Sequence, residues 1–234
     1  MTRARRSLVY APATQPDTAT FAANTDADGI ILDLESTVDD SEKEHAREQL
    51  QTIVDSIDVG TQESIVRIND LRGDRWQDDI RAALDAGVDT LRLPKIESPT
   101  EVIQAVSFAN GHADYRPEFL LQLETPLGLL NGREIALTSA EFSQVTGIGI
   151  GIGDYTTALG LPGHGPELRA FVLNQCAAFA AVGEMDALAY VHKDLDSLRE
   201  AAALARDLGH VGQPISHAVD VAAFIDILHD IYPA

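Results

Sequence analysis

The chain has 234 residues, of which 45% are hydrophobic, and this length and composition predict one medium-sized domain with a substantial buried core. Its single cysteine, Cys176, excludes an intrachain disulfide and a cysteine-rich zinc site, as is usual in a reducing compartment such as the cytoplasm. The formal net charge of −20 argues against nucleic acids and anionic membranes as partners, because chain and phosphates would repel each other.

The N-terminal segment MTRARRSLVYAP has basic residues followed by only a short apolar run that contains Pro12, so we predict a first strand here and no signal peptide. No stretch approaches the roughly 18 uninterrupted apolar residues of a membrane helix, and we therefore expect a soluble, cytoplasmic protein. Three lysines stand against 23 aspartates, a bias expected of a surface that must stay hydrated in concentrated salt. Adaptation to salt is a hypothesis at this point.

Short β-branched or apolar runs alternate eight times with longer stretches of helical spacing. The predicted strands are Ser7–Pro12, Gly29–Glu35, Ser64–Asn69, Thr90–Ile96, Phe119–Thr125, Val145–Asp154, Asp186–Val191 and Val211–His217. The predicted helices lie near 15–26, 41–56, 74–87, 99–110, 128–139, 166–183, 194–208 and 218–231.

The runs are apolar on both faces, which is typical of parallel strands buried between a barrel interior and an outer layer of helices. Two helix starts carry capping signals: Ser41 with Glu44 has the spacing of a capping box, and Ser98-Pro99-Thr100-Glu101 places proline in a first turn. An open doubly wound sheet would give a similar alternation. Eight near-even units without a long insertion favour a (β/α)₈ barrel that spans residues 1–234 as a single domain.

In such a barrel the functional groups lie at the C-terminal ends of the strands, so the polar residues that close the apolar runs are the candidates. These residues are Asp33, Glu35, Arg67, Asn69, Lys95, Glu97, Glu124 and Asp154. Glu124 and Asp154 follow neighbouring strands and could share one Mg²⁺ while leaving coordination positions for substrate oxygens. Alternatively, each carboxylate caps a helix or pairs with a surface arginine, and spacing alone does not decide between these readings.

Arg67 ends an apolar strand, so its guanidinium should emerge at the mouth of the barrel as a fork for a carboxylate or oxo-acid oxygen. The alternative is a salt bridge at the rim with Asp33 or Glu35. The two roles are compatible, because a carboxylate of the protein can orient an arginine that binds a carboxylate of the substrate.

Glycine occupies alternate positions from Gly147 to Gly153, and one face of that strand therefore lacks side chains. Close packing of a large neighbour is one explanation, and close approach of the backbone to a ligand near Gly153 is another. Among the histidines, only His192 and His217 lie where they could face the mouth. Cys176 is expected in the core.

The sequence resembles the HpcH/HpaI aldolase and citrate lyase β-subunit superfamily, specifically its citrate lyase β-subunit-like branch, nearly end to end. The segments that carry the resemblance are RRSLVYAP (5–12), DGIILDLESTVDDSEKEHAR (28–47), IVRIN (65–69), LRLPKIES (91–98), LETPLGLLN (123–131), GIGDYTTALG (151–160) and GQPISHAVD (212–220). Their common order and barrel-compatible spacing make the likeness more specific than any single motif.

The resemblance implies that Glu124 and Asp154 are the two protein ligands of Mg²⁺ and that Arg67 binds the carboxylate end of the substrate. It further implies that Glu35, together with Asp33, supports catalysis by ordering water or the metal site. The backbone around Lys95 and the end of the first strand at Pro12 would border the path of an acyl thioester, with Gly153 near the substrate.

The implied reaction is Mg²⁺-dependent cleavage of a carbon–carbon bond in a short 3-hydroxyacyl thioester of the malyl-, citramalyl- or citryl-CoA type. Its products would be a 2-oxo acid and an acyl thioester, carried on CoA or on an acyl carrier. The alternatives are a thioesterase or Claisen-type synthase on similar thioesters, and a non-catalytic accessory subunit of a lyase complex. Relatives are typically trimers or hexamers, so the resemblance implies a homotrimer or homohexamer.

The sequence departs from the family pattern in three places. Ser36 replaces the last acidic residue of the usual DLED, and Gln213 and Ala218 replace the lysine and proline of the usual GK-x-x-IHP. The sequence stops at Ala234, soon after the last predicted helix, so we expect it to lack the C-terminal arm through which many relatives bring an acidic residue to a neighbouring subunit.

Overall fold

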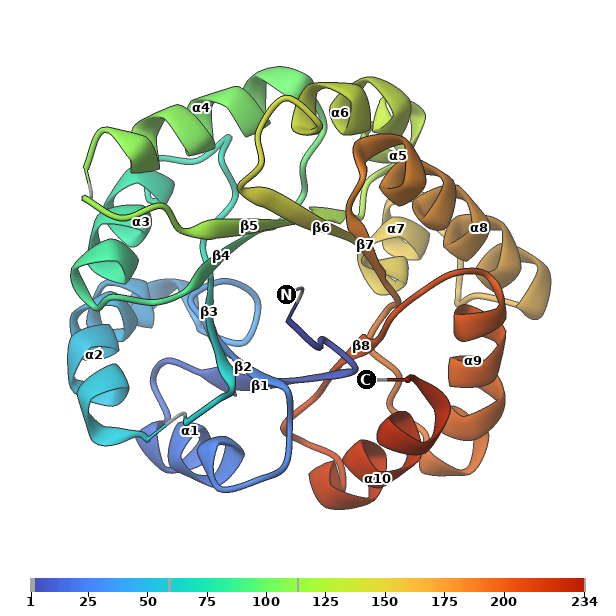
Figure 1. Ribbon diagram of the computed structural model, residues 1–234, viewed down its shortest axis with the longest axis horizontal. Coiled ribbons are helices and arrows are strands. Elements are labelled where there is room, and N and C mark those ends of the chain that lie inside the picture. Colours follow the sequence, from blue (N-terminus) through green and yellow to red (C-terminus); the bar gives the residue numbers. More distant parts are fainter. Residues whose placement is uncertain (1–2, 59, 113, 234) are drawn as a thin grey trace.

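The computed structural model describes residues 3–58, 60–112 and 114–233 and contains eight parallel strands surrounded by helices (Figure 1). The strands are β1 (Ser7–Pro12), β2 (Gly29–Asp33), β3 (Glu63–Arg67), β4 (Thr90–Leu93), β5 (Glu118–Leu123), β6 (Val145–Ile150), β7 (Asp186–Leu188) and β8 (Gln213–Ile215). Each overlaps a predicted strand. Apart from β1, the strands end before their predicted ends, most clearly β4, β6, β7 and β8. The (β/α)₈ architecture is therefore confirmed.

The strands of the sheet follow the order β7-β6-β5-β4-β3-β2-β1-β8. All neighbours in this order are consecutive in the sequence except β1 and β8. Two isolated parallel bridges, Leu188 with Gly212 and His192 with Ile215, join the two ends. Backbone N–H groups of Ala189 and Val211 also donate across this seam, each at 2.9 Å. The barrel is thus nearly closed, with its thinnest pairing between β7 and β8.

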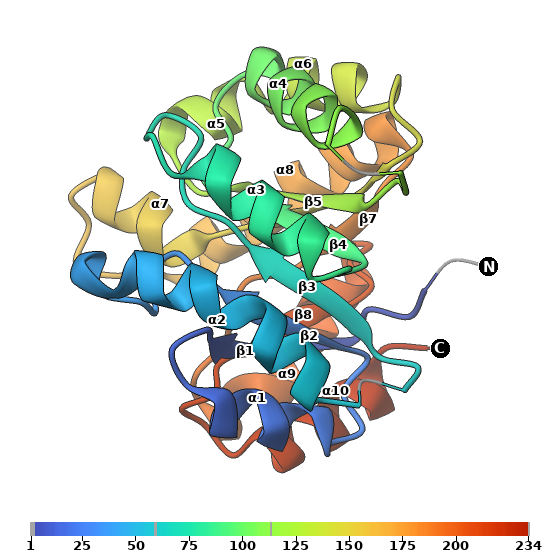
Figure 2. The same cartoon turned by 90° about the vertical axis from the view of Figure 1, so that its left-hand side faces the viewer.

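The helices form the outer layer, as the side view shows (Figure 2). They are α1 (Pro16–Ala23), α2 (Lys43–Ser56), α3 (Trp76–Asp85), α4 (Pro99–Asn110), α5 (Pro126–Leu130), α6 (Gly132–Ser139), α7 (Ile152–Ala158), α8 (Pro166–Gly183), α9 (Leu195–Asp207) and α10 (Val221–Ile231), with a short 3₁₀ helix η1 (Asp40–Glu42) before α2. None of the helices in the described part of the chain is long and apolar enough to cross a membrane.

The capping prediction at Ser98 is confirmed, because its side chain accepts from the Glu101 N–H while the Glu101 side chain accepts from the Ser98 N–H. The prediction at Ser41 is wrong. Ser41 lies inside η1, and α2 begins after Glu42 without a side-chain cap. The single helix predicted at 128–139 is also wrong in detail, since the chain forms α5 and α6 with a break at Asn131.

The apolar core has two parts. The larger part lies between the strands and the helices, and the smaller fills the barrel interior with Leu8, Tyr10, Ile31, Ile65, Leu120 and Leu188. Cys176 is fully buried in the larger part, as predicted. Because strand residues alternate between the two faces, every second residue of a strand points into the interior, and those at the C-terminal ends of the strands lie at the mouth.

Candidate active site at the mouth of the barrel

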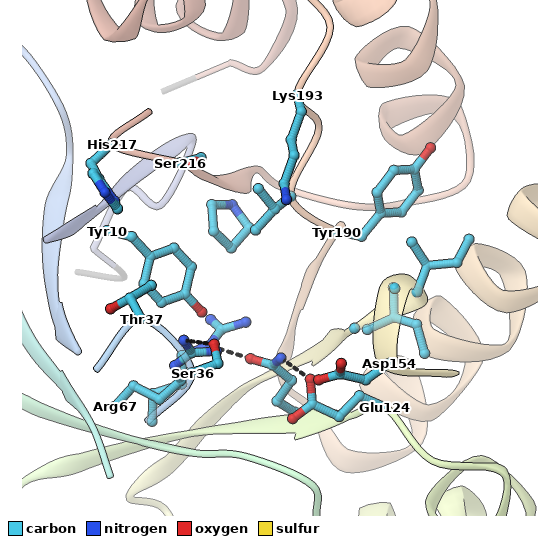
Figure 3. A pocket seen from close by; sticks show the side chains of 18 residues that line it. Tyr10, Ser36, Thr37, Arg67, Glu124, Asp154, Tyr190, Lys193, Ser216 and His217 are labelled. Atoms are coloured by element: carbon cyan, nitrogen blue, oxygen red, sulfur yellow. Dashed lines mark hydrogen bonds between the residues drawn. The ribbon is translucent and has the colours of Figure 1, made fainter. Parts of the chain in front are cut away.

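A cavity of about 240 Å³ opens at the C-terminal ends of the strands (Figure 3). Its charged and polar lining includes Tyr10, Arg67, Arg92, Gln122, Glu124, Asp154, Lys193 and His217. This is the end of a (β/α)₈ barrel where active sites are built. The cavity therefore gathers several residues that the sequence singled out.

Glu124 and Asp154 lie side by side in this cavity (Figure 3). Glu124 directly follows β5 and is 2% exposed, whereas Asp154 lies exposed in the first turn of α7. The expectation that strand six runs to Asp154 is wrong, because β6 ends at Ile150 and the chain turns into α7 before it reaches the aspartate. That turn brings the second carboxylate to the first.

Two neighbours fix the Glu124 carboxylate: the backbone N–H of Lys95 donates to Oε1 at 3.0 Å, and Nε2 of Gln122 donates to Oε2. Burial raises the pKa of Glu124 to about 7, and the negative charge of Asp154 acts in the same direction. A cation bound between the two carboxylates would relieve both effects.

This donor set fits Mg²⁺ in particular. No group of three or more His, Cys, Asp or Glu side chains suited to a metal occurs among the described residues. Mg²⁺ is commonly held by one or two carboxylates, with water and substrate oxygens in its other positions. Glu124 and Asp154 could supply those two ligands.

Arg67 lies at the end of β3, beside Asp33 of β2, its partner in the strand register. Nε donates to Oδ1 at 2.7 Å and Nη2 donates to Oδ2 at 2.6 Å. Nη2 also donates to the Ser36 hydroxyl at 2.6 Å, and the guanidinium lies 4.6 Å from the centre of the Tyr10 ring. The rim salt bridge considered as an alternative is present, yet Arg67 also lines the cavity.

Asp33 is completely buried and accepts five hydrogen bonds, two of them from Arg67. Burial alone would raise the pKa of Asp33, but the Arg67 charge and the donated hydrogen bonds together hold it below its usual value. The same contacts keep the pKa of Arg67 well above its ordinary value despite burial. Asp33 therefore orients Arg67 and does not itself line the cavity.

Glu35 and Lys95 form an ion pair beside this site. The second oxygen of Glu35 lies 3.3 Å from Nη1 of Arg67. Lys95 adopts a left-handed backbone conformation with φ of 52°, which is unusual for a residue with a side chain and directs its N–H at Glu124. Of the predicted substrate-binding residues, Gly153 is among the described residues that line the cavity, whereas Pro12 and Lys95 are not.

The alternating glycines of β6 and the turn after it leave space for side chains from β4 and β5. A Cβ on Gly149 would lie 3.3 Å from Nη2 of Arg92, and one on Gly151 would lie 2.5 Å from Cβ of Glu124. Packing of large neighbours, the first of the two explanations considered, accounts for both positions.

Sequence reasoning missed Tyr10, Arg92, Gln122 and Lys193, all of which line the cavity. Arg92 and Gln122 could have been found from the two-residue period of their strands, because both are polar residues at inward positions of otherwise apolar runs. His217 lines the cavity as considered. His192 is buried, and its Nε2 forms a hydrogen bond with the Ser197 hydroxyl at 2.9 Å.

The chain is similar to known proteins in sequence and in fold. The model of the HpcH/HpaI aldolase/citrate lyase family matches residues 6–218. The chain is 32% identical to a citrate lyase subunit beta of Leuconostoc mesenteroides over 66% of this chain and 52% of that protein. It is 31% identical to a (3S)-malyl-CoA thioesterase of Cereibacter sphaeroides over 97% and 76% of the two chains. It thus spans about half the length of the first relative and three quarters of the second.

Two solved structures from Mycobacterium tuberculosis show the same fold. The protein CitE in complex with magnesium, acetoacetate and coenzyme A has a TM-score of 0.80 and 25% identity, over 99% of this chain and 82% of that one. The citrate lyase beta subunit complexed with oxaloacetate and magnesium has a TM-score of 0.80 and 24% identity, over 99% and 98% of the two chains.

Proposed function

Because the chain belongs to the HpcH/HpaI aldolase/citrate lyase family, we propose that it is a Mg²⁺-dependent carbon–carbon lyase acting on a short 3-hydroxyacyl thioester. The observation that carries the proposal is the convergence of Glu124, Asp154 and Arg67 on one cavity at the mouth of the barrel. Malyl-, citramalyl- and citryl-type thioesters are the candidate substrates.

Glu124 and Asp154 would hold Mg²⁺, which supplies a Lewis acid for the substrate hydroxyl or carbonyl oxygen and the neighbouring carboxylate. Arg67 would bind the substrate through Nη1, which lies 3.3 Å from Oε2 of Glu35 but donates no hydrogen bond within the described residues. Asp33 and Ser36 accept from Nε and Nη2. Gln122 and the Lys95 N–H would keep the Glu124 carboxylate in position. In this proposal the side chains of the cavity bind and orient the reacting group.

In the proposed reaction the bond between C2 and C3 of the hydroxyacyl group breaks. The hydroxyl proton passes to water, C3 becomes the carbonyl carbon of a 2-oxo acid, and the electron pair of the broken bond passes to the thioester enolate. Protonation of that enolate at C2 gives the acyl thioester. Positive charge at the hydroxyl oxygen favours loss of its proton, and Arg67 and the bound cation would supply it.

Incubation with malyl-, citramalyl- and citryl-CoA, with detection of the 2-oxo acid, tests the proposal. We expect product formation that requires Mg²⁺ and is abolished in Glu124→Gln, which removes the ligand charge and keeps its size. Glu48→Gln, an exposed position on α2, is the matched control and should retain full activity. Full activity in Glu124→Gln would refute the assignment.

A thioesterase is the second candidate, favoured by the 31% identity to the (3S)-malyl-CoA thioesterase over nearly the whole chain. Hydrolysis of the thioester would release free thiol together with an intact hydroxy acid. The same incubations therefore distinguish the two activities: thiol release without a 2-oxo acid identifies the hydrolase, and a 2-oxo acid without thiol release identifies the lyase.

A further inference from the structure

Arg92 of β4 is a buried arginine without an anionic partner. It is 2% exposed, and no ion pair among the described residues includes it. Nε donates to Oε1 of Gln122 at 2.7 Å, whereas Nη1 is buried without any hydrogen-bond partner. Arg92 lines the same cavity as Glu124, Asp154 and Arg67.

The two other buried arginines of the barrel interior differ from Arg92. Arg5 at the opposite end pairs with Glu63 at 2.7 Å and with Glu118 and Asp186, and Arg67 pairs with Asp33 and Glu35. An ion removed from water without a counter-ion carries a large desolvation penalty, so buried arginines are normally paired. The unpaired Arg92 therefore indicates an anion that the chain itself does not provide.

The position of Arg92 identifies where this anion would lie. Arg92 is the register partner of Arg67 across β3 and β4, and Gln122 joins it to the Glu124 carboxylate through its two amide ends. Glycine at position 149 accommodates the guanidinium, because a Cβ there would lie 3.3 Å from Nη2. The guanidinium is therefore a cavity-lining cation next to Arg67 and one residue removed from the proposed metal ligand.

The formal charges around the cavity also indicate a place for an anion beside Arg92. Asp33 and Glu35 balance Arg67 and Lys95, with which they form ion pairs. Mg²⁺ would balance Glu124 and Asp154. Of the two remaining cations of the lining, Lys193 is exposed to solvent, whereas Arg92 is a buried excess positive charge. A guanidinium is the side chain best matched to a carboxylate.

We propose that Arg92 is a specificity-determining residue that binds a second carboxylate of the 2-oxo acid, so that the enzyme prefers oxo-dicarboxylates to oxo-monocarboxylates. This inference rests on the proposed function, because it assumes that the first carboxylate and the carbonyl oxygen of the oxo acid lie at Arg67 and the metal ligands. It deepens that function by selecting among substrates that differ in the oxo acid they release.

Calorimetric titration of the protein in saturating Mg²⁺ with oxaloacetate and with 2-oxobutyrate tests the inference. Both acids have four carbons, and they differ in the distal carboxylate. We expect the wild type to bind oxaloacetate about 10–100-fold more tightly, the range for hydrogen bonds to a charged group. In Arg92→Met, the affinity for oxaloacetate should fall to the level of the affinity for 2-oxobutyrate. The affinity for 2-oxobutyrate should stay within about 2-fold of its wild-type value.

Arg133→Met, an exposed arginine on α6, is the matched control and should keep the preference. Loss of an unpaired buried charge should not unfold the protein. If Arg92→Met nevertheless fails to fold, Arg92→Gln is a second neutral variant that can still form a hydrogen bond with Gln122, and the same loss of preference is expected.

Equal wild-type affinity for the two acids would overturn the role of Arg92 and leave Mg²⁺-dependent oxo-acid binding intact. An unchanged preference in Arg92→Met, or equal weakening of both acids, would also overturn it, because the arginine would then have a purely structural role. If neither acid bound in the presence of Mg²⁺, the proposed function itself would fail, and the two failures are therefore distinguishable.

Discussion

Arg67 donates to both carboxylate oxygens of Asp33, and the two residues are direct partners in the register of β2 and β3. The direction of the guanidinium is thus set by strand pairing and not by a flexible loop. Arg67 would meet its ligand in an orientation that already exists in the folded chain, which lowers the entropic cost of binding.

Asp33→Asn should destabilise the fold by about 3–5 kcal/mol, because it leaves the buried Arg67 without its main counter-ion. Urea unfolding followed by circular dichroism would measure the change. Asp17→Asn, at an exposed position in α1, should change the free energy of unfolding by less than about 0.5 kcal/mol. Equal effects of the two substitutions would contradict the role given to this pair.

The pH dependence of stability should also depend on Asp33. The pKa of Asp33 lies below its usual value in the folded chain, so its stabilising contribution is present above the ordinary aspartate pKa of about 3.9 and is lost as the pH falls through the lower folded value. Asp33→Asn should therefore flatten the acid limb of a plot of unfolding free energy against pH. An unchanged slope below about pH 4 would show that Asp33 is not held in its charged form.

Gly151→Ala should weaken Mg²⁺ binding, because the added methyl group would collide with the Glu124 side chain. Disturbing the surroundings that hold a metal-ligating side chain in place typically weakens metal binding by about 10–100-fold. Isothermal titration with MgCl₂ measures the effect. Gly163→Ala, where the added methyl group meets nothing within 4 Å, is the control, and equal affinity in all three proteins would count against the packing argument.

Mg²⁺ should raise the melting temperature of the wild type but not of Asp154→Asn. A ligand that binds only the folded state stabilises it by about 2.7 kcal/mol at 100 times its dissociation constant. Differential scanning fluorimetry across a MgCl₂ series would show this, with KCl at matched ionic strength to remove the general effect of salt. A similar rise in Asp154→Asn would place the metal elsewhere.

Added KCl by itself should increase the free energy of unfolding. The net charge of −20 causes repulsion across the surface, and salt at 0.1 M screens the repulsion between exposed charges that lie more than about 10 Å apart. Urea unfolding from about 0.05 to 2 M KCl would test this expectation. Stability that stayed level or fell would contradict the hypothesis of a salt-adapted surface.

The architecture could be predicted from the sequence because each strand of the barrel is buried on both faces and each helix on one. This pattern of burial repeats eight times along the chain. It can still be recognised when the predicted ends of an element are wrong by a few residues. The short lengths of β7 and β8 were not predictable, since the apolar run continues after Leu188 while isolated bridges and single backbone hydrogen bonds replace a continuous ladder there.

The site could be predicted only in part. Glu124 directly follows a strand, so its place at the mouth follows from the fold, whereas Asp154 reaches the mouth through a turn of helix that the glycine-rich run did not reveal. Arg92 and Gln122 do not close their strands, so the rule that places functional groups at strand ends does not identify them, although the alternation of strand side chains directs both inward.

A crystal structure of the protein with Mg²⁺ and oxaloacetate tests the central claim most directly. The account predicts one metal ion ligated by Glu124 and Asp154 at about 2.0–2.1 Å, with oxo-acid oxygens completing its coordination and Nη1 of Arg67 within hydrogen-bond distance of the acid. Density for the metal or the acid away from these three side chains, with the cavity filled only by water, would contradict it.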